Sequence, residues 1–280
     1  MKAIVIGMGV QGIKRKKYLK NNYVCSVDKY KKDADYKNLN DVPLKLYDSA
    51  FICTPDNQKV NLIKYLLKNN KNILVEKPLV ASNSDLKKLN HQINKRNIFF
   101  YTAYNHRFEP SLIKAKEIIK QKKIGKIYKL KLFYGNGTAK LVKKSMWRDK
   151  NKGIITDLGS HLIDICLFLF NQPIKNIKLL KSNRFENRSP DHAIIIFEIG
   201  SIKVLIEMTY LMWKNSFFLD IIGSKGSLHI NSLCKWSNSS LILRKRKFPA
   251  GIPSELRFSY PKGDPTWKLE NNFFLGLDWR

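Results

Sequence analysis

The sequence is poor in cysteine and in acidic residues, and it has no apolar run long enough to cross a membrane. Its four cysteines are far apart and form no Cys-x-x-Cys pair: Cys25, Cys53, Cys166 and Cys234. This spacing argues against a zinc site, so we expect buried free thiols in a reducing cytoplasm and no metal. The most apolar stretch, residues 154–170, contains two aspartates and a histidine and is not a membrane span. The start of the chain shows no signal-peptide pattern.

Acidic residues are outnumbered by basic ones, 22 against 52, which gives a formal net charge of +30. Such a charge suggests a polyanionic partner, such as nucleic acid. However, 42 of the 52 basic residues are lysine, and the two clusters, residues 14–17 and 244–247, are not interleaved with aromatic residues. We therefore predict a lysine-rich solvated surface and no dedicated nucleic-acid partner, with a basic polyanion-binding protein as the less favoured alternative. The positive charge of the protein would still attract a substrate that bears phosphate.

A glycine-rich motif follows the first predicted strand, residues 2–6. It reads Gly7-Met8-Gly9-Val10-Gln11-Gly12 and leads into a predicted helix that ends near Lys20. This is the G-x-G-x-x-G fingerprint with a strand before it and a helix after it, as dinucleotide binding requires. The glycines allow a tight turn, a close approach to a pyrophosphate and close packing of the helix. The first backbone N–H groups of the helix, near Val10 and Gln11, are then available to the phosphates.

An aspartate ends the second predicted strand, residues 23–27. Asp28 lies 21 residues after Gly7, where an acceptor for a ribose hydroxyl is expected. The alternative is an ordinary acid at a strand end. Asp28 favours NAD over NADP because it would repel a 2′-phosphate, but Lys29, Lys31 and Lys32 weaken that preference, and NADP stays possible.

A lysine stands at the end of a later buried strand, residues 72–75. The chain continues there as Glu76-Lys77-Pro78, and an earlier strand, residues 50–53, ends in Thr54-Pro55. Ligands of open α/β sheets bind at the carboxyl ends of the strands, which makes Lys77 a candidate rather than a simple Lys-Pro turn. Strands alternate with helices through this half, which predicts a doubly wound parallel sheet. We assign Thr54, Pro55, Glu76 and Lys77 to the cofactor site.

The second half is different in kind, because strand-like runs dominate after Gly125. We expect an α+β domain with an open, mostly antiparallel sheet. One helix, residues 154–170, interrupts the strands and carries Asp157, His161 and Asp164 within a narrow arc beside an apolar stripe. Such a helix can pack on a sheet while it shows two carboxylates and an imidazole to a cleft. The alternative is a satisfied, partly buried histidine with solvent-facing acids.

These motifs occur in a fixed order, together with Asn105-His106-Arg107-Phe108-Glu109-Pro110 and the segment from Asp157 to Asp164. The ordered set resembles the Gfo/Idh/MocA family of nicotinamide-dependent oxidoreductases. The resemblance implies a Rossmann domain, which we place at residues 1–108, and a second domain at residues 109–280 whose open sheet supports a homo-oligomer. It also implies that Lys77, His161 and Asp157 line the cleft between nicotinamide and substrate.

On this resemblance we expect hydride transfer between the cofactor and a secondary alcohol or ketone of a sugar, nucleotide-sugar or cyclitol. His161 is the preferred general base, because an imidazole titrates near neutrality. Lys77 would hold the developing alkoxide, and Asp157 would orient the substrate or His161. The substrate-binding candidates are Asn105, Arg107, Arg148 and Asp164, although Arg148 has the alternative of stacking on Trp147. A non-catalytic NAD-binding or regulatory protein is the alternative function.

The chain also departs from the family pattern. Lys59 stands where the family usually has a histidine, and the glycine-rich lead into the helix at residues 154–170 is reduced to Lys152-Gly153-Ile154. The stretch between Asp28 and Ala50 is short, so we expect an abbreviated half-sheet. We also expect that the terminal segment that returns to the Rossmann domain is missing after residues 267–274.

Overall fold

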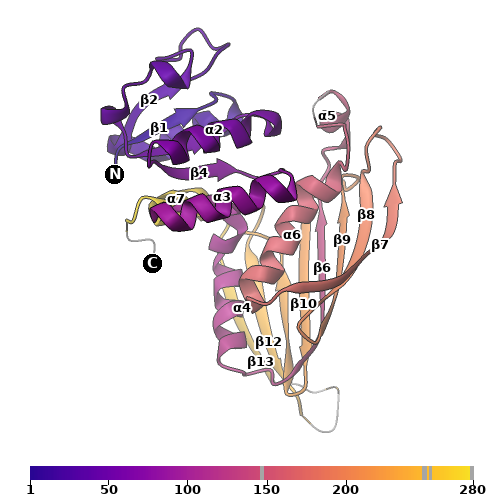
Figure 1. Cartoon of the computed structure of the whole chain (residues 1–280). Coiled ribbons are helices and arrows are strands. Elements are labelled where there is room, and N and C mark those ends of the chain that lie inside the picture. The colour runs from indigo at the N-terminus through magenta and orange to yellow at the C-terminus, as the bar shows by residue number, and fades with distance from the viewer. Residues whose placement is uncertain (146–147, 248–250, 252–253, 278–280) are drawn as a thin grey trace. The chain divides into compact units, whose positions relative to one another are not determined.

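The computed structural model describes residues 1–145, 148–247, 251 and 254–277 (Figure 1). The chain divides into two compact units. The first comprises Met1–Asn105 and Trp267–Arg280, and the second comprises His106–Thr266. The C-terminal residues therefore belong with the N-terminal unit and not with the second domain, where the sequence had placed them.

The first unit contains a five-stranded parallel sheet in the order β2-β1-β3-β4-β5. Its strands are β1 (Ala3–Ile6), β2 (Tyr23–Val27), β3 (Ser49–Ile52), β4 (Asn72–Glu76) and β5 (Phe100–Ala103). Its N-terminal helices are α1 (Val10–Leu19), α2 (Asp56–Lys68) and α3 (Asn83–Arg96). All residues of β1 and β3 are buried, as expected for central strands that are covered on both faces. The strand order reverses between β1 and β3, which is where such sheets bind ligands.

One local expectation for this unit is confirmed. The connection from β2 to β3 holds only short 3-10 turns, Leu39–Asp41 and Leu44–Leu46, so this half of the sheet is abbreviated. Ser82 caps α3, because its hydroxyl accepts a hydrogen bond from the backbone N–H of Asp85 at 3.0 Å.

The C-terminal helix α7 (Pro265–Phe274) corrects the expectation that the returning segment is missing. Phe274 is fully buried, and its ring lies 5.1 Å from that of Phe51 on β3 and 5.3 Å from that of Phe99. Phe273 contacts Tyr101 of β5 in the same way, with ring centroids 5.5 Å apart. These aromatic contacts hold the end of the chain on the first sheet. The local sequence pattern could not reveal them, because their partners lie far away in the chain.

The second unit contains an eight-stranded sheet in the order β13-β12-β11-β10-β6-β9-β8-β7. The β6–β9 pair is parallel and the other neighbouring pairs are antiparallel, so the predicted fold class is confirmed. The strands are β6 (Ile127–Gly135), β7 (Ile174–Asn183), β8 (His192–Ile199), β9 (Ile202–Thr209), β10 (Ser216–Gly223), β11 (Gly226–Asn231), β12 (Ser239–Lys245) and β13 (Ser254–Tyr260). In the described part of this unit they are accompanied by the helices α4 (Pro110–Lys120), α5 (Ala139–Lys143) and α6 (Ile154–Phe170).

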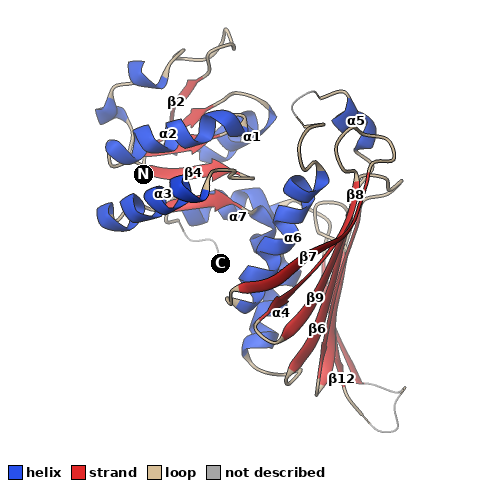
Figure 2. Ribbon diagram, turned by 45° about the vertical axis from the view of Figure 1, so that its right-hand side comes forward, coloured by secondary structure: helices blue, strands red, loops and turns tan. Residues whose placement is uncertain are grey.

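Figure 2 shows α4 and α6 on one face of this sheet. The predicted apolar stripe of α6 lies in the core, with Leu158, Leu162, Ile165 and Leu169 buried against the strands. Its burial turns the polar side of α6 away from the sheet and fixes the direction of its acids and its histidine. The other face of the sheet stays open and carries exposed aromatic side chains such as Phe218.

Among the described residues, no helix is long and apolar enough to cross a membrane, and no group of three or more His, Cys, Asp or Glu side chains is arranged to hold a metal ion. All four cysteines are free, and three of them are buried.

Candidate functional site

The glycine-rich turn has the geometry that dinucleotide binding requires. Gly7 has φ +92°, and a Cβ added to Gly12 would lie 1.9 Å from the carbonyl oxygen of Gly7. Gly9 is different, because a Cβ there would meet no atom within 4 Å. Gly9 is also the N-cap of α1, and its lack of a side chain leaves the first N–H groups of the helix, from Val10 and Gln11, without a side-chain cap. The turn therefore offers an open cradle with backbone donors, which fits a pyrophosphate.

Asp28 lies beside this turn and is hydrogen-bonded to its backbone. Its Oδ2 accepts the backbone N–H of Met8 at 2.7 Å, and its Oδ1 accepts those of Tyr30 and Lys31 at 2.9 and 3.0 Å. Burial raises the pKa of Asp28, but the three hydrogen bonds outweigh it and hold the pKa below its ordinary value. Asp28 is thus a fixed, ionised and only half-buried acceptor, which fits a ribose hydroxyl.

Thr54 and Pro55 follow β3 at the same end of the sheet. Pro55 is the N-cap of α2, and the methyl group of Thr54 lies against Gly7. The hydroxyl oxygen of Thr54 is buried and has no hydrogen-bond partner among the described residues. An orphaned buried hydroxyl beside the glycine turn fits a site completed by a bound molecule.

Lys77 follows β4 directly, is half-buried, and precedes Pro78 through a cis peptide bond. The turn is held by Lys59, which stands in place of the family's histidine and is only 2% exposed. Its Nζ donates to Oδ1 of Asp56 at 2.7 Å and to the carbonyl oxygen of Pro78 at 2.8 Å. Burial lowers the pKa of Lys59, against the opposing effect of Asp56. Lys59 therefore places a donor on the turn that carries Lys77.

Glu76, which we had assigned to the cofactor, forms part of a buried charge cluster. Arg15 of α1 is fully buried, and its Nε donates to Oε1 of Glu76 at 2.7 Å. Its two terminal nitrogens donate to Oε2 of Glu270 at 2.6 Å and to Oδ1 of Asn271 at 2.5 Å, both on α7. Burial raises the pKa of Glu270 to about 7, Glu76 adds to the rise and Arg15 opposes it. This cluster joins α1, the end of β4 and α7.

Sequence reasoning missed the role of Arg15. Arg15 lies in the basic cluster at residues 14–17, which we had interpreted as solvated surface. Lys14, Lys16 and Lys17 are indeed exposed, but Arg15 is buried, with its guanidinium carbon 4.4 Å from the ring centre of Trp267. The only signal was an arginine among lysines, which matches the preference of buried ion pairs for the planar guanidinium.

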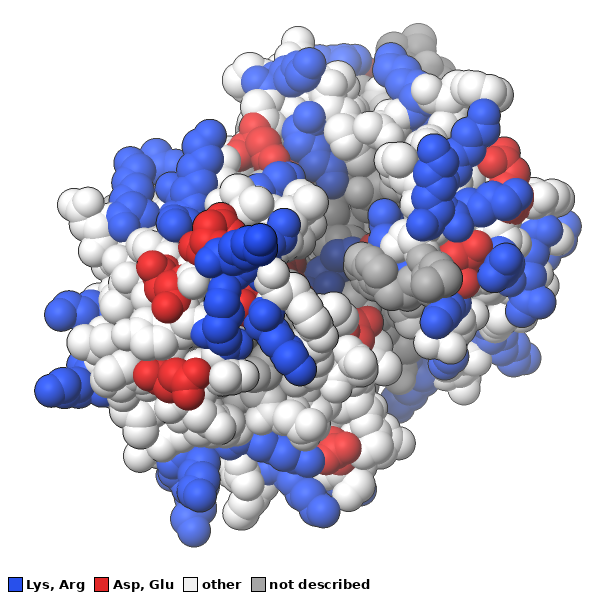
Figure 3. All heavy atoms as spheres, turned by 90° about the horizontal axis from the view of Figure 1, so that it is seen from above, with Lys and Arg blue, Asp and Glu red and all other residues white. Residues whose placement is uncertain are grey.

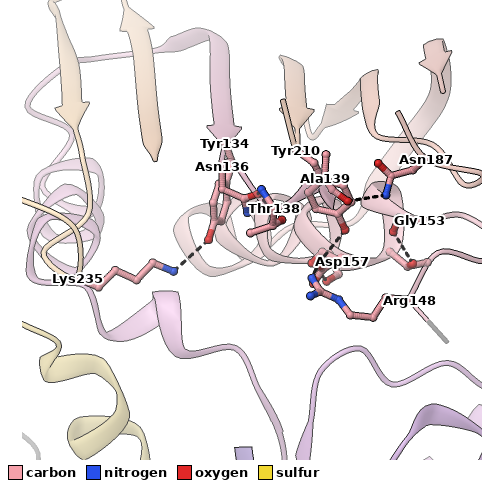
Figure 4. A network of polar contacts seen from close by, with 12 residues as sticks. Tyr134, Asn136, Thr138, Ala139, Arg148, Gly153, Asp157, Asn187, Tyr210 and Lys235 are labelled. Atoms are coloured by element: carbon pink, nitrogen blue, oxygen red, sulfur yellow. Dashed lines mark hydrogen bonds and ion pairs between the residues drawn. The ribbon is translucent and has the colours of Figure 1, made fainter. Parts of the chain in front are cut away.

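In the second unit, Asp157 is held near the start of α6 by two partners. Nη2 of Arg148 lies 3.0 Å from its Oδ2, and the hydroxyl of Tyr210 donates to the same oxygen at 2.8 Å. Figure 4 shows both side chains pointing toward Asp157. Burial raises the pKa of Tyr210, and the neighbouring carboxylate raises it further. The alternative in which Arg148 stacks on Trp147 lies outside the described residues.

Arg107 and Asp164, both predicted to bind substrate, form an ion pair with each other. Nε and Nη2 of Arg107 donate to the two carboxylate oxygens at 2.8 and 2.5 Å. Asp164 is 5% exposed, so it is not a solvent-facing acid. Burial raises its pKa, and Arg107 opposes the rise. Such a two-point pair fixes the orientation of both side chains.

His161 is 6% exposed and is paired with a second histidine that sequence reasoning did not assign a role. Its Nδ1 lies 2.7 Å from Nδ1 of His106, which is 2% exposed. Nζ of Lys235 lies 3.3 Å from the other ring nitrogen of His106 and donates to the hydroxyl of Tyr134 at 3.0 Å (Figure 4). His106 was visible in the motif at residues 105–110, but no local pattern indicated Lys235. Asn105, the last residue of the first unit, is buried.

Basic side chains are dispersed over the face of the molecule that Figure 3 shows. Figure 3 shows lysine and arginine scattered over the face in view, with acidic and uncharged residues between them. This distribution agrees with the predicted lysine-rich surface rather than with a continuous basic stripe.

Two family models match the chain. Residues 3–104 match the "Oxidoreductase family, NAD-binding Rossmann fold", and residues 112–229 match the "GFO/IDH/MocA C-terminal domain". The chain belongs to the GFO/IDH/MocA family of NAD-dependent oxidoreductases. The resemblance inferred from the ordered motifs is thereby confirmed.

Among curated relatives, glucose-6-phosphate 3-dehydrogenase of Bacillus subtilis is 27% identical over 58% of this chain and 46% of its own length. The scyllo-inositol 2-dehydrogenase (NAD(+)) of the same organism is 26% identical over 74% of this chain and 60% of its own length. The chain thus spans about half the length of the curated relatives it matches. A solved structure of levoglucosan dehydrogenase in complex with NADH superposes with a TM-score of 0.83 at 15% identity, covering 99% of this chain and 90% of that one. This similarity supports the fold.

Proposed function

We propose that the protein is an NAD-dependent oxidoreductase that acts on a secondary alcohol or ketone of a sugar, nucleotide-sugar or cyclitol. The observation that carries the proposal is the buried acid–base face of α6, with His161 and Asp157 each held by a partner, in a chain that also has an open dinucleotide cradle. The relatives named above are dehydrogenases of a sugar phosphate and of an inositol, which supports this substrate class.

Different residues of the first unit would bind different parts of the cofactor. Gly7, Gly9 and Gly12 with the N–H groups of Val10 and Gln11 receive the pyrophosphate, and Asp28 receives the ribose. The orphaned hydroxyl of Thr54 and the adjacent Pro55 line the same strand end, and Lys77 would lie beside the nicotinamide. We propose that Glu76 acts indirectly, since its carboxylate is engaged by Arg15.

The remaining residues act on the substrate. When bound, oxidised NAD would accept the hydride that leaves the carbinol carbon. His161 exchanges the proton of the reacting hydroxyl, and Lys77 stabilises the developing alkoxide by its positive charge. Asp157 orients the substrate hydroxyls from a position that Arg148 and Tyr210 fix. Asn105 would bind the substrate, and the Arg107–Asp164 pair holds α6 in place.

A cofactor titration followed by a substrate screen tests this function. We expect NADH to quench or enhance the protein fluorescence on binding, and the panel of sugars, sugar phosphates, nucleotide-sugars and inositols to reveal turnover. Binding without turnover on any member of the panel would support the non-catalytic alternative. Binding to DNA that depends strongly on salt and is not displaced by NADH would support the polyanion-binding alternative.

Asp28 makes a specific prediction about the cofactor. Asp28→Ala is expected to weaken NADH binding about tenfold and to reduce the preference over NADPH, because two ribose hydrogen bonds to a charged acceptor are lost. Asp33→Ala is the matched control, since Asp33 is an exposed acid in the same loop. An unchanged NADH/NADPH ratio in Asp28→Ala would contradict the ribose assignment.

We further propose that a second copy of the chain covers the open face of the eight-stranded sheet. A hollow of about 260 Å³ on this face is lined by Phe133, Met212 and Phe218 together with Lys131 and the two acids Glu207 and Asp220. A mixed-charge, partly apolar patch can be complementary to its own copy across a two-fold axis. Light scattering is expected to show an oligomer, and Phe218→Glu is expected to shift it toward monomer. A wild-type chain that is monomeric at micromolar concentration would exclude this interface.

A further inference from the structure

In the hydrogen bond between His106 and His161, one ring must be the donor and the other the acceptor. The two rings lie edge to face, with centroids 4.1 Å apart and planes at 80°, and their Nδ1 atoms are 2.7 Å apart. A neutral imidazole carries a proton on one nitrogen and a lone pair on the other. A hydrogen bond between two Nδ1 atoms therefore requires one ring to donate from Nδ1 and the other to accept there.

Lys235 decides which ring donates. Its Nζ lies 3.3 Å from Nε2 of His106, and an ammonium group has three donors and no acceptor. Nε2 of His106 must then accept, which places the ring proton of His106 on Nδ1. His106 in turn donates to Nδ1 of His161, and the proton of a neutral His161 is left on Nε2.

The surroundings hold Lys235 in this position. Its Nζ donates to the hydroxyl of Tyr134 at 3.0 Å and lies 4.6 Å from the ring centre of Trp236. The ring of Tyr134 also lies edge-on to that of His106, with centroids 5.6 Å apart. Glu109, at the start of α4, has a fully buried carboxylate that faces this ammonium. Burial raises the pKa of Glu109, and the positive charge of Lys235 lowers it. The charged and titratable neighbours of Lys235 are thus His106, Tyr134 of β6, and Glu109 at the start of α4.

We propose that Lys235 and His106 are positioning residues that hold neutral His161 in its Nε2–H tautomer. For catalysis this inference rests on the proposed function. In that reaction His161 presents a proton, not a lone pair, to the substrate oxygen, which suits protonation of an alkoxide during carbonyl reduction. The substrate oxygen takes the Nε2 proton, Nδ1 of His161 takes the proton of His106 Nδ1, and Nε2 of His106 takes one from the ammonium of Lys235. Lys235, which is half-buried, regains its proton from water. Oxidation of the alcohol runs the same chain in reverse.

The tautomers can be read directly by NMR without any turnover. The chain has only five histidines, so selective ¹⁵N-histidine labelling gives few signals, which single substitutions assign. At pH 8, where an ordinary histidine is neutral, we expect His161 with a bare Nδ1 and a protonated Nε2, and His106 with the opposite pattern. A protonated Nδ1 on His161 would overturn the proposal. This result stands whether or not a substrate is found.

Substitution of Lys235 gives the second measurement. Lys235→Met is expected to mix the tautomers of His161 and to shift the histidine ionisation in the pH–rate profile upward by about 0.5–1 pH unit, because removal of a nearby cation favours imidazolium. Lys235→Arg is expected to keep the wild-type tautomer. Lys214→Met, which removes an exposed lysine of the same unit, is the control for general charge effects.

The outcomes separate the two proposals. Unaltered tautomers and an unshifted profile in Lys235→Met, with a wild-type melting temperature as proof of folding, would refute the positioning role. A wild-type protein that binds NADH, shows the expected tautomers and turns over no substrate would refute the proposed function and leave the tautomer assignment intact.

Discussion

Replacement of His161 with alanine is expected to lower turnover about 10²–10⁴-fold, the usual cost of losing a general acid–base group. The affinity for NADH should change little, because His161 belongs to the second unit and the residues assigned to the cofactor belong to the first. Steady-state rates in both directions, with NADH binding measured separately, check this expectation. The loss should appear in kcat more than in KM, since the proton is transferred only as the reaction proceeds.

The matched control is His91→Ala. His91 is an exposed histidine on α3 of the first unit, so its removal changes the same side-chain chemistry outside the unit that carries α6. We expect its turnover to match the wild type. If turnover of His161→Ala also stays within about twofold of the wild type, below any general acid–base effect, then His161 is not the acid–base group.

Among substitutions in the first unit, Gly12→Ala is expected to have the largest effect on stability and on NADH binding. The added Cβ of Gly12→Ala would lie 1.9 Å from the carbonyl oxygen of Gly7, and backbone must move to relieve the overlap. Overpacking of this kind costs about 1–3 kcal/mol or more, and the displaced turn loses its donors. We expect a lower melting temperature and no measurable NADH binding at concentrations that saturate the wild type.

Gly9→Ala is the companion variant that separates folding from binding. Gly9 has φ −75°, which alanine adopts freely, and its Cβ would meet no protein atom within 4 Å. The melting temperature of the free protein should therefore stay the same, while the methyl group occupies the space that we assign to the pyrophosphate. We expect NADH affinity to fall at least about tenfold through this overlap. Wild-type affinity in Gly9→Ala would show that the cofactor does not use this cradle.

The buried cluster around Arg15 explains how the chain keeps its C-terminal residues on the first unit. A fully buried guanidinium donates to Glu76, Glu270 and Asn271, so both carboxylates gain a charge-assisted partner inside the protein. Removal of one member would leave uncompensated charge in the interior, which is costly. The same bond to Glu76 fixes the backbone one residue before Lys77. The C-terminal helix thereby contributes to the position of the end of β4.

The sequence by itself determined the features that depend on short spacing. The glycine motif, Asp28 at the end of β2 and Lys77 after β4 could be located because a strand end and the turn after it are encoded by neighbouring residues. The polar face of α6 could be located because a 3.6-residue period places Asp157 and His161 on one side of a helix whose apolar stripe is buried. The family followed from the order of these motifs.

Only the tertiary structure decided which partners these residues have. His106 and His161 are 55 residues apart, Lys235 and His106 are 129 apart, and Arg15 and Glu270 are 255 apart. No local period or propensity encodes such pairs, because they form only when the packed sheets and helices bring distant segments together. The sequence therefore predicted an imidazole on α6, and the fold decided where its proton lies. It did so by placing a lysine cation next to the histidine that pairs with His161.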